Sequence, residues 1–259
     1  MAGTAIFTRR DGRFSASELA RGPWDPDAQH GGAVAALLMR AFERCEGGDA
    51  LAMARVTYEF LRPVPLGELE VKASVTQSHR RVQWLEGSIL DRSGIELVRA
   101  RALRVMPAET GGVTVEPPPP PGPDQGRPHH LEPPHGLRMF ADAIEIRFVA
   151  GAFGGGPSTA WFRLRNSLVA GEAPSPLQRL AASSDFGNGI SAVLSWDEYL
   201  FINPDLTLYI DRDPVGEWIC LQSKTTLASD GIGTAESVLF DESGRIGRAM
   251  QALLVARHR

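Results

Sequence analysis

The stretch Val-Thr-Tyr-Glu-Phe-Leu-Arg-Pro at residues 56–63 aligns with Leu-Thr-Leu-Tyr-Ile-Asp-Arg-Asp at residues 206–213, about 150 positions later in the chain. The same offset brings Leu-Asp-Arg-Ser-Gly at residues 90–94 onto Phe-Asp-Glu-Ser-Gly at residues 240–244. This period is far longer than the 20–50 residues of solenoid repeats, so it predicts a fused pair of like domains. Functional sites often form where two such domains meet.

The first repeat predicts one helix followed by strands. A run of small apolar residues after His30 predicts a buried helix from Gly31 to Cys45, which Gly47 and Gly48 end. Alternating segments separated by Gly67 and by Ser-Gly at residues 93–94 predict the strands. One helix followed by antiparallel strands fits an α+β fold in which the sheet wraps around the helix. The predicted strands cover residues 53–61, 68–77, 82–91 and 95–105.

The second repeat has the same order of elements. Ser175 as cap and Pro176 as first helical residue begin a helix that runs towards Asp185. We therefore predict two long helices, each wrapped by an antiparallel sheet. The predicted strands of this half cover residues 144–148, 160–165, 205–212, 217–228, 232–241 and 245–257.

A proline-rich segment separates the halves. Residues 117–121 are five consecutive prolines, which favour an extended connection running over the surface. A ligand for a proline-binding module is the alternative interpretation. We predict a first domain at residues 1–106, a linker at 107–135 and a second domain at 136–259.

Composition excludes several classes of protein. The 259 residues are 43% hydrophobic and 22% charged, as in ordinary globular proteins. A net charge of −4 gives no electrostatic basis for binding nucleic acid. No apolar run is long enough for a membrane span, and the N-terminus lacks a signal peptide's apolar stretch. Cys45 and Cys220 are expected to be reduced, so we predict a cytoplasmic protein.

Three polar residues stand out for their predicted positions. Asp185 shares a helix face with Leu177 and Ala181, so its carboxylate must be partnered or used in chemistry, or else it simply ends the helix. Thr207 lies on the polar face of its strand, which faces either solvent or a cleft. Gln251 shares an apolar strand face with Leu253, where its amide needs hydrogen-bond partners that backbone groups could also supply.

Other candidates carry weaker signals. His30, Gly31 and Gly32 begin the first helix, where backbone N–H groups could bind a carbonyl oxygen or an anion, although a capping histidine explains the same pattern. No nucleotide-binding glycine motif or serine-hydrolase elbow is present. The linker histidines lack a metal-ligand pattern, so we predict no metal site. They are His129, His130 and His135.

Taken together, the motifs of both halves resemble the acyl-CoA thioesterase II-like family, which has a double hot-dog fold. The resemblance implies hydrolysis of acyl-CoA by a water that Asp185, Thr207 and Gln251 hold. It also implies no cofactor and, by analogy, a homodimer or larger assembly. The matching segments are Gly22–Trp24, Gln29–Gly32, Phe60–Pro63, Ser175–Leu180, Ser184–Phe186, Gly216–Trp218 and Gly247–Gln251.

The repeat is not symmetric at the expected site. Thr57 aligns with Thr207, but Arg101 aligns with Gln251, and the first helix contains no aspartate. We therefore predict one competent site, in the second half. Arg101 could hold a phosphate of coenzyme A or form a structural ion pair. A hydratase or dehydratase using His30, and a non-catalytic acyl-CoA-binding protein, are the alternative functions.

Overall fold

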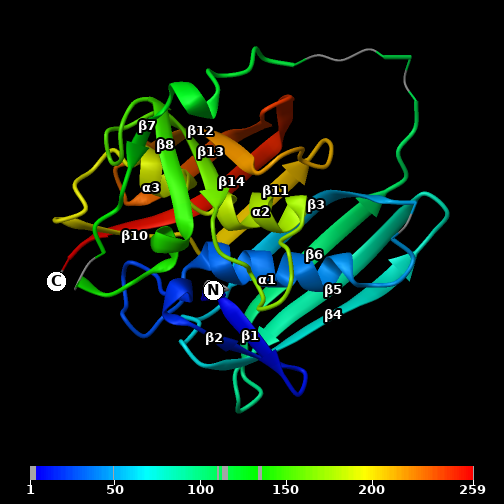
Figure 1. Ribbon diagram of the computed structural model, residues 1–259. Helices are drawn as coiled ribbons and strands as arrows, with labels where there is room; N and C mark the ends of the chain where they lie inside the picture. Colours follow the sequence, from blue (N-terminus) through cyan, green and yellow to red (C-terminus); the bar gives the residue numbers. More distant parts are fainter. Residues whose placement is uncertain (1–3, 49, 110, 113–115, 134–135, 259) are drawn as a thin grey trace.

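A curved antiparallel sheet surrounds two adjacent helices in the computed structural model, which describes residues 4–48, 50–109, 111–112, 116–133 and 136–258 (Figure 1). The helices are α1 (Gly31–Glu43), α2 (Pro176–Ser184) and the short α3 (Gly187–Ser191). The strands are β1 (Phe7–Arg10), β2 (Arg13–Ala16), β3 (Ala52–Phe60), β4 (Glu68–Ser78), β5 (Val82–Leu90), β6 (Glu96–Val105), β7 (Arg127–His129), β8 (Ile144–Ala150), β9 (Ser158–Leu164), β10 (Tyr199–Ile202), β11 (Asp205–Ile210), β12 (Trp218–Leu227), β13 (Ile232–Asp241) and β14 (Gly244–Arg257).

The sequence repeat corresponds to a local two-fold arrangement of the sheet. The strand order β4-β5-β6-β3 continues directly into the equivalent strands in reverse order, β11-β14-β13-β12, as a two-fold rotation requires. At the centre, β3 and β11 pair antiparallel with Thr57 opposite Thr207, and Oγ1 of Thr207 donates to Oγ1 of Thr57 at 3.2 Å. The two halves therefore share one continuous sheet, with the repeated stretch on its axis.

The helices pack together inside this sheet because their contact faces are small and apolar. Residues Gly32 to Met39 of α1 are all buried, and α1 lies directly beside α2 (Figure 1). The two helices run antiparallel: a Cβ on Gly32, near the start of α1, would lie 2.5 Å from the carbonyl oxygen of Ala182, near the end of α2. Only glycine permits this approach, which brings the end of α2 to the start of α1.

The second helix is shorter than predicted. α2 ends after nine residues, and α3 begins only at Gly187. The hydroxyls of Ser183 and Ser184 donate to the carbonyl oxygens four residues earlier, at 2.9 and 2.7 Å, a pattern that often bends helices. The expectation of a long helix is therefore met by α1, whereas the second helix breaks at Asp185 and Phe186.

Part of the predicted linker belongs to the second half. Residues Arg127–His129 form β7, which pairs with β8 at the edge of the sheet. Before it, the indole of Trp161 donates to the carbonyl oxygen of Pro121 at 2.7 Å. Trp161 belongs to a small apolar cluster on the outer face of β9, β12 and β13. The segment 121–129 thus covers a hydrophobic patch rather than spanning free space.

Two short elements were not predicted from the sequence. The hairpin β1–β2 turns at Asp11 and Gly12, and its Phe7 N–H donates to the carbonyl oxygen of Leu168 in the other half. β10 pairs with the end of β14. The strands β1, β2 and β10 have four residues each, which is too short to show a reliable alternation of apolar and polar residues. Within the described residues, no helix has the length and apolar character that crossing a membrane requires.

A half-buried acid, Glu43, lies where α1 ends beside the start of α2. Oε2 of Glu43 accepts a hydrogen bond from the Gln178 amide at 2.7 Å. Burial raises the pKa of the Glu43 carboxyl, and the negative charge of Asp213 raises it further, although hydrogen bonds from Ser175 and Gln178 oppose both effects. The ionised form of Glu43 is therefore disfavoured by the fold.

We expect Glu43→Gln to stabilise the protein at alkaline pH and not at acid pH. An acid with a raised folded pKa stabilises the fold at low pH and loses that contribution as the pH rises through the folded value. Glutamine keeps an acceptor for Gln178 without the charge. Differential scanning fluorimetry should show a gain of about 2–4 °C at pH 8, the shift that about 1 kcal/mol produces in a chain of this size. Glu46→Gln, at an exposed neighbour, is the control and should show no gain.

Candidate active site

The Asp185 carboxylate lies buried where the two halves meet. Its side chain is 6% exposed, because α2 ends at this residue against the start of α1. Oδ1 accepts hydrogen bonds from the Asn203 amide at 2.8 Å and the Gln251 amide at 3.0 Å. Two elements of the second half, the turn between β10 and β11 and strand β14, therefore fix one carboxylate oxygen in place.

Gln251 has its amide orientation set from both sides. Its Oε1 accepts the backbone N–H of Asn188 at 3.1 Å, so its NH₂ group must point towards Asp185. The side chain is 2% exposed and faces the helices from β14. The buried amide is thus satisfied by the backbone N–H of Asn188, the backbone carbonyl of Asp185 and the Asp185 carboxylate, so backbone groups and a side chain both partner it.

His30 brings the first half to the other carboxylate oxygen. Its Nδ1 lies 3.0 Å from Oδ2 of Asp185 and also 3.0 Å from the backbone N of Gly32. One ring nitrogen cannot accept from Gly32 and donate to Asp185 at the same time. The histidine therefore either caps α1 with an unprotonated Nδ1, or donates from a protonated Nδ1 to Asp185 and releases the Gly32 N–H.

Aromatic rings and a glycine surround His30 and the Asp185 carboxylate. The His30 ring stacks on Phe186 at 4.7 Å between centroids and lies 5.1 Å from that of Phe140. A Cβ on Gly31 would lie 2.7 Å from Oδ2 of Asp185 and 3.1 Å from the Phe60 ring. The start of α1 must therefore be free of side-chain atoms for the carboxylate to keep its position.

This arrangement suits general-base chemistry. Oδ1 is held by two amide donors, while Oδ2 faces the start of a helix, whose backbone N–H groups carry partial positive charge. A carboxylate fixed in this way can orient and deprotonate a water, and a backbone N–H beside it can polarise a carbonyl group.

Thr207 lies apart from this set. It is on the outer strand face with the exposed Tyr209, whereas Leu206 and Leu208 point to the core. Its hydroxyl donates to Thr57, and among the described residues no hydrogen bond joins it to Asp185 or Gln251. The residue that sequence reasoning missed is Asn203, in an Asn-Pro turn before β11 that has no distinctive pattern of its own.

Arg101 is also outside the site. Its side chain is 68% exposed and pairs with Glu86 at 3.2 Å, which is the structural role considered from the sequence. The strand register further corrects the alignment of the repeats. Thr207 pairs with Met250 and Thr57 pairs with Arg101, so the position equivalent to Gln251 is Ala102. The first half therefore lacks the amide as well as the aspartate.

Metal ligands do not assemble in the part of the chain that the structure describes. No three His, Cys, Asp or Glu side chains come together there as a metal-binding group. The His129 ring stacks on Phe153, and His130 lies 3.9 Å from Asp142. His135 falls outside the described residues. Cys45 and Cys220 are free thiols.

Comparisons with known proteins agree on one family. The model of the acyl-CoA thioesterase N-terminal domain matches residues 20–105, and that of the acyl-CoA thioesterase C-terminal domain matches residues 114–255. No curated protein sequence gives a significant match.

Solved structures share the fold over nearly the whole chain. A protein of unknown function with a hot-dog fold from Alicyclobacillus acidocaldarius has a TM-score of 0.75 at 15% identity, covering 98% of this chain and 96% of its own. A protein assigned as a thioesterase II from Thermobifida fusca has a TM-score of 0.73 at 19% identity, covering 97% and 95%. The acyl-CoA thioesterase II TesB2 from Mycobacterium marinum has a TM-score of 0.68 at 16% identity, covering 96% and 94%.

Proposed function

Since this chain belongs to the acyl-CoA thioesterase family and is a thioester hydrolase, we propose that it hydrolyses acyl-CoA to a free acid and CoA at Asp185. The observation that carries this proposal is the buried carboxylate whose Oδ1 is held by two amides while its Oδ2 faces the start of α1. The test is release of CoA thiol from short, medium and long acyl-CoAs, followed with a thiol reagent.

Asp185 would act as the general base. It takes a proton from a water as the water oxygen attacks the thioester carbonyl carbon. The tetrahedral intermediate then collapses, the C–S bond breaks, and the CoA thiolate receives the proton. A well-placed general base contributes about 10²–10⁴-fold to the rate. Gln251 and Asn203 hold the carboxylate in position for both proton transfers.

The start of α1 would stabilise the negative charge that develops on the carbonyl oxygen. The Gly32 N–H points to His30 Nδ1 in the unliganded geometry. When His30 donates from Nδ1 to Asp185 instead, this N–H becomes available to the substrate oxygen. One such donor contributes about 10²–10³-fold. His30 thus acts as a positioning residue that couples the carboxylate to the helix start.

The amide of Asn203 takes the place in this proposal that the family resemblance assigned to Thr207. Asn203 contacts the carboxylate directly, whereas the hydroxyl of Thr207 bonds to Thr57. A role for Thr207 in holding the water stays a prediction that can be checked separately. Thr207→Val removes its hydroxyl from the axis of the sheet and leaves Asp185 and its two amide partners unchanged.

A hydratase or dehydratase is the second candidate, because His30 lies within 3.0 Å of Asp185 and such enzymes use a histidine. The two functions differ in their products. Hydration of an enoyl-CoA consumes the double bond and leaves the thioester intact, whereas hydrolysis releases CoA. Saturable acyl-CoA binding with neither reaction would instead indicate a binding protein.

We expect Asn203→Asp to lower kcat/KM about tenfold or more near neutral pH and to move the acid limb of the pH profile to higher pH. The substitution places a second carboxylate where an amide donor now lies 2.8 Å from Oδ1 of Asp185. Two adjacent carboxylates share a proton, so Asp185 becomes an available base only at higher pH. Asn203→Ala should lower the rate without this shift, and an unshifted profile for Asn203→Asp would contradict the assigned position.

A further inference from the structure

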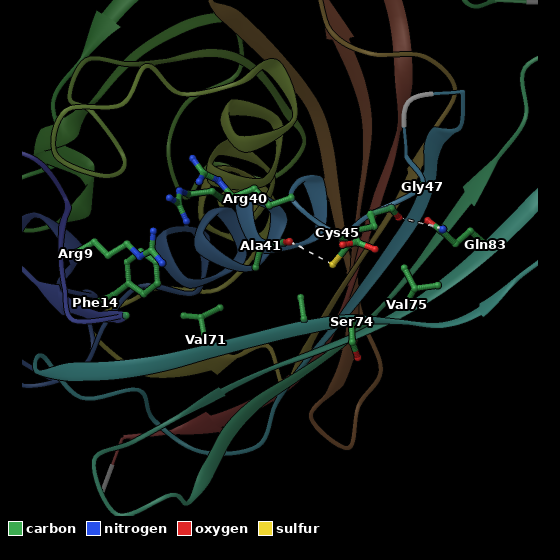
Figure 2. Close-up of a pocket in the computed structure, with 14 residues that line it drawn as sticks. Arg9, Phe14, Arg40, Ala41, Cys45, Gly47, Val71, Ser74, Val75 and Gln83 are labelled. Atoms are coloured by element: carbon green, nitrogen blue, oxygen red, sulfur yellow. Dashed lines mark hydrogen bonds between the residues drawn. The ribbon is translucent and has the colours of Figure 1, made fainter.

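A cavity lies in the first half, between the C-terminal part of α1 and strand β4 (Figure 2). Its volume is about 790 Å³, within the range of about 300–1,000 Å³ that small-molecule sites occupy. Residues of α1, of β4 and of the N-terminal hairpin line it. The cavity plays no part in the site around Asp185.

The floor of the cavity is apolar. Val71, Ala73 and Val75 are alternate residues of β4 that pack against the core, yet they are only half-buried, whereas Leu69 on the same face is fully buried. The helix therefore leaves this part of the inner sheet face uncovered. Ala41 of α1 and Cys45, two residues after the helix ends, form the opposite wall.

One end of the cavity is cationic. Arg9 and Arg40 lie there with Phe14, while Val75 lies towards the other end (Figure 2). Arg40 is only 4% exposed and binds the carboxylate of Glu172 through two hydrogen bonds, at 2.7 and 2.6 Å. Arg44 binds the same carboxylate at 3.0 Å. Glu172 therefore neutralises part of the charge of Arg40 and Arg44, whereas Arg9 adds a third guanidinium group to the lining, and Glu46 is the acid that lines the cavity.

The position of this charge argues for a separate ligand rather than for the acyl chain of the substrate. Gly31 at the Asp185 site and Arg40 are nine residues apart on α1, which corresponds to about 14 Å along the helix axis. An acyl chain extending from the thioester would bring its methylene groups against guanidinium groups. A molecule with an anionic group would pair that group with the arginines at one end of the cavity and pack its apolar part against β4.

We propose that this cavity binds a long-chain fatty acid, with the carboxylate at Arg9, Arg40 and Arg44 and the alkyl chain against Val71, Ala73 and Val75. A carboxylate matches the fork geometry of arginine. The ligand belongs to the chemical class of the product in the proposed function, and its site is independent of Asp185. The inference rests on the cavity and its charges and stands whether or not the chain hydrolyses acyl-CoA.

The test is binding of palmitate below its critical micelle concentration to the full chain, measured by isothermal titration calorimetry. Ala73→Phe fills the floor, and Arg44→Gln removes a cation at a 56% exposed position where folding is not at risk. We expect each to weaken palmitate binding about tenfold or more. Lys72→Gln, on the outer face of β4, should leave the affinity within about twofold. Hexadecanol, which lacks the charge, should bind about tenfold more weakly than palmitate.

Other results would overturn the proposal. Palmitate affinity unchanged in both Ala73→Phe and Arg44→Gln would place the ligand elsewhere. Weaker binding of palmitoyl-CoA with unchanged binding of palmitate would assign the cavity to the substrate. A changed sedimentation coefficient of Ala73→Phe with unchanged palmitate binding would assign it to a second copy of the chain. Hydrolysis of acyl-CoA by Ala73→Phe should stay at the wild-type rate. The thiol-release assay therefore tests the Asp185 proposal, and palmitate binding tests the cavity proposal separately.

Discussion

Asp185→Asn is expected to lower kcat for acyl-CoA hydrolysis by about 10²–10⁴-fold, the contribution of a positioned general base, with little change in KM. The asparagine oxygen can still accept from the amides of Asn203 and Gln251, which now donate to Oδ1 at 2.8 and 3.0 Å. Its NH₂ group would then face Nδ1 of His30. The variant therefore loses the base and keeps the hydrogen bonds that hold the site together.

The measurement is the rate of CoA thiol release under saturating substrate, together with the midpoint of thermal unfolding. Wild-type stability combined with the loss of turnover assigns the effect to chemistry. The matched control is Asp205→Asn. Asp205 is a partly buried aspartate near the site whose carboxylate accepts the Ala252 N–H at 2.7 Å and does not touch Asp185. Turnover of Asp185→Asn within about threefold of the wild type would show that another group is the base.

Gly31→Ala is expected to lower kcat/KM by about 10²-fold while leaving the fold intact. The new Cβ would lie 2.7 Å from Oδ2 of Asp185, so the carboxylate must move away from its position. A displacement of about 1 Å in a reacting group can cost about 10²-fold. Alanine also favours a helix over glycine by about 1 kcal/mol, which offsets part of the strain. Activity and stability should therefore not fall together.

Gly67→Ala is the control for this substitution, because a Cβ at that turn meets no atom within 4 Å. Both variants are compared by thiol release and by thermal unfolding. A marked fall in the unfolding temperature of Gly31→Ala would indicate that the glycine serves packing between α1 and α2. Unchanged activity would indicate that the carboxylate does not need its present position.

The repeat and its strands could be predicted from the sequence because they depend on local periodicity. The strand predicted at residues 232–241 matches β13, and the repeated stretch at residues 56–63 and 206–213 covers the ends of β3 and β11 and the three residues after each. Short strands such as β1 and β10 and the break after α2 carry no comparable signal. They depend on pairing with distant strands and on the Ser183 and Ser184 hydroxyls, which compete for backbone carbonyl groups.

Some residues of the candidate site could likewise be predicted from the sequence, and others could not. Burial reasoning selected Asp185 and Gln251, because a polar residue on an apolar face needs a partner, and the structure pairs them at 3.0 Å. The same reasoning could not identify Asn203, because a turn residue does not belong to an apolar or polar face of a helix or strand. It also could not align Ala102 with Gln251, because a one-residue shift in strand register changes which side chains occupy equivalent positions.

The sequence alone predicted the repeated order of helix and strands and singled out Asp185 as a polar residue on an apolar helix face of the second half. These follow from which side chains are apolar and at what spacing, and each chain segment carries that information itself. Only the tertiary structure decided that His30 and Gly31 of the first half meet Asp185, that Thr207 faces Thr57, and where α1 leaves part of β4 uncovered. Those features arise from how two helices and one sheet pack together, and no single segment encodes that geometry.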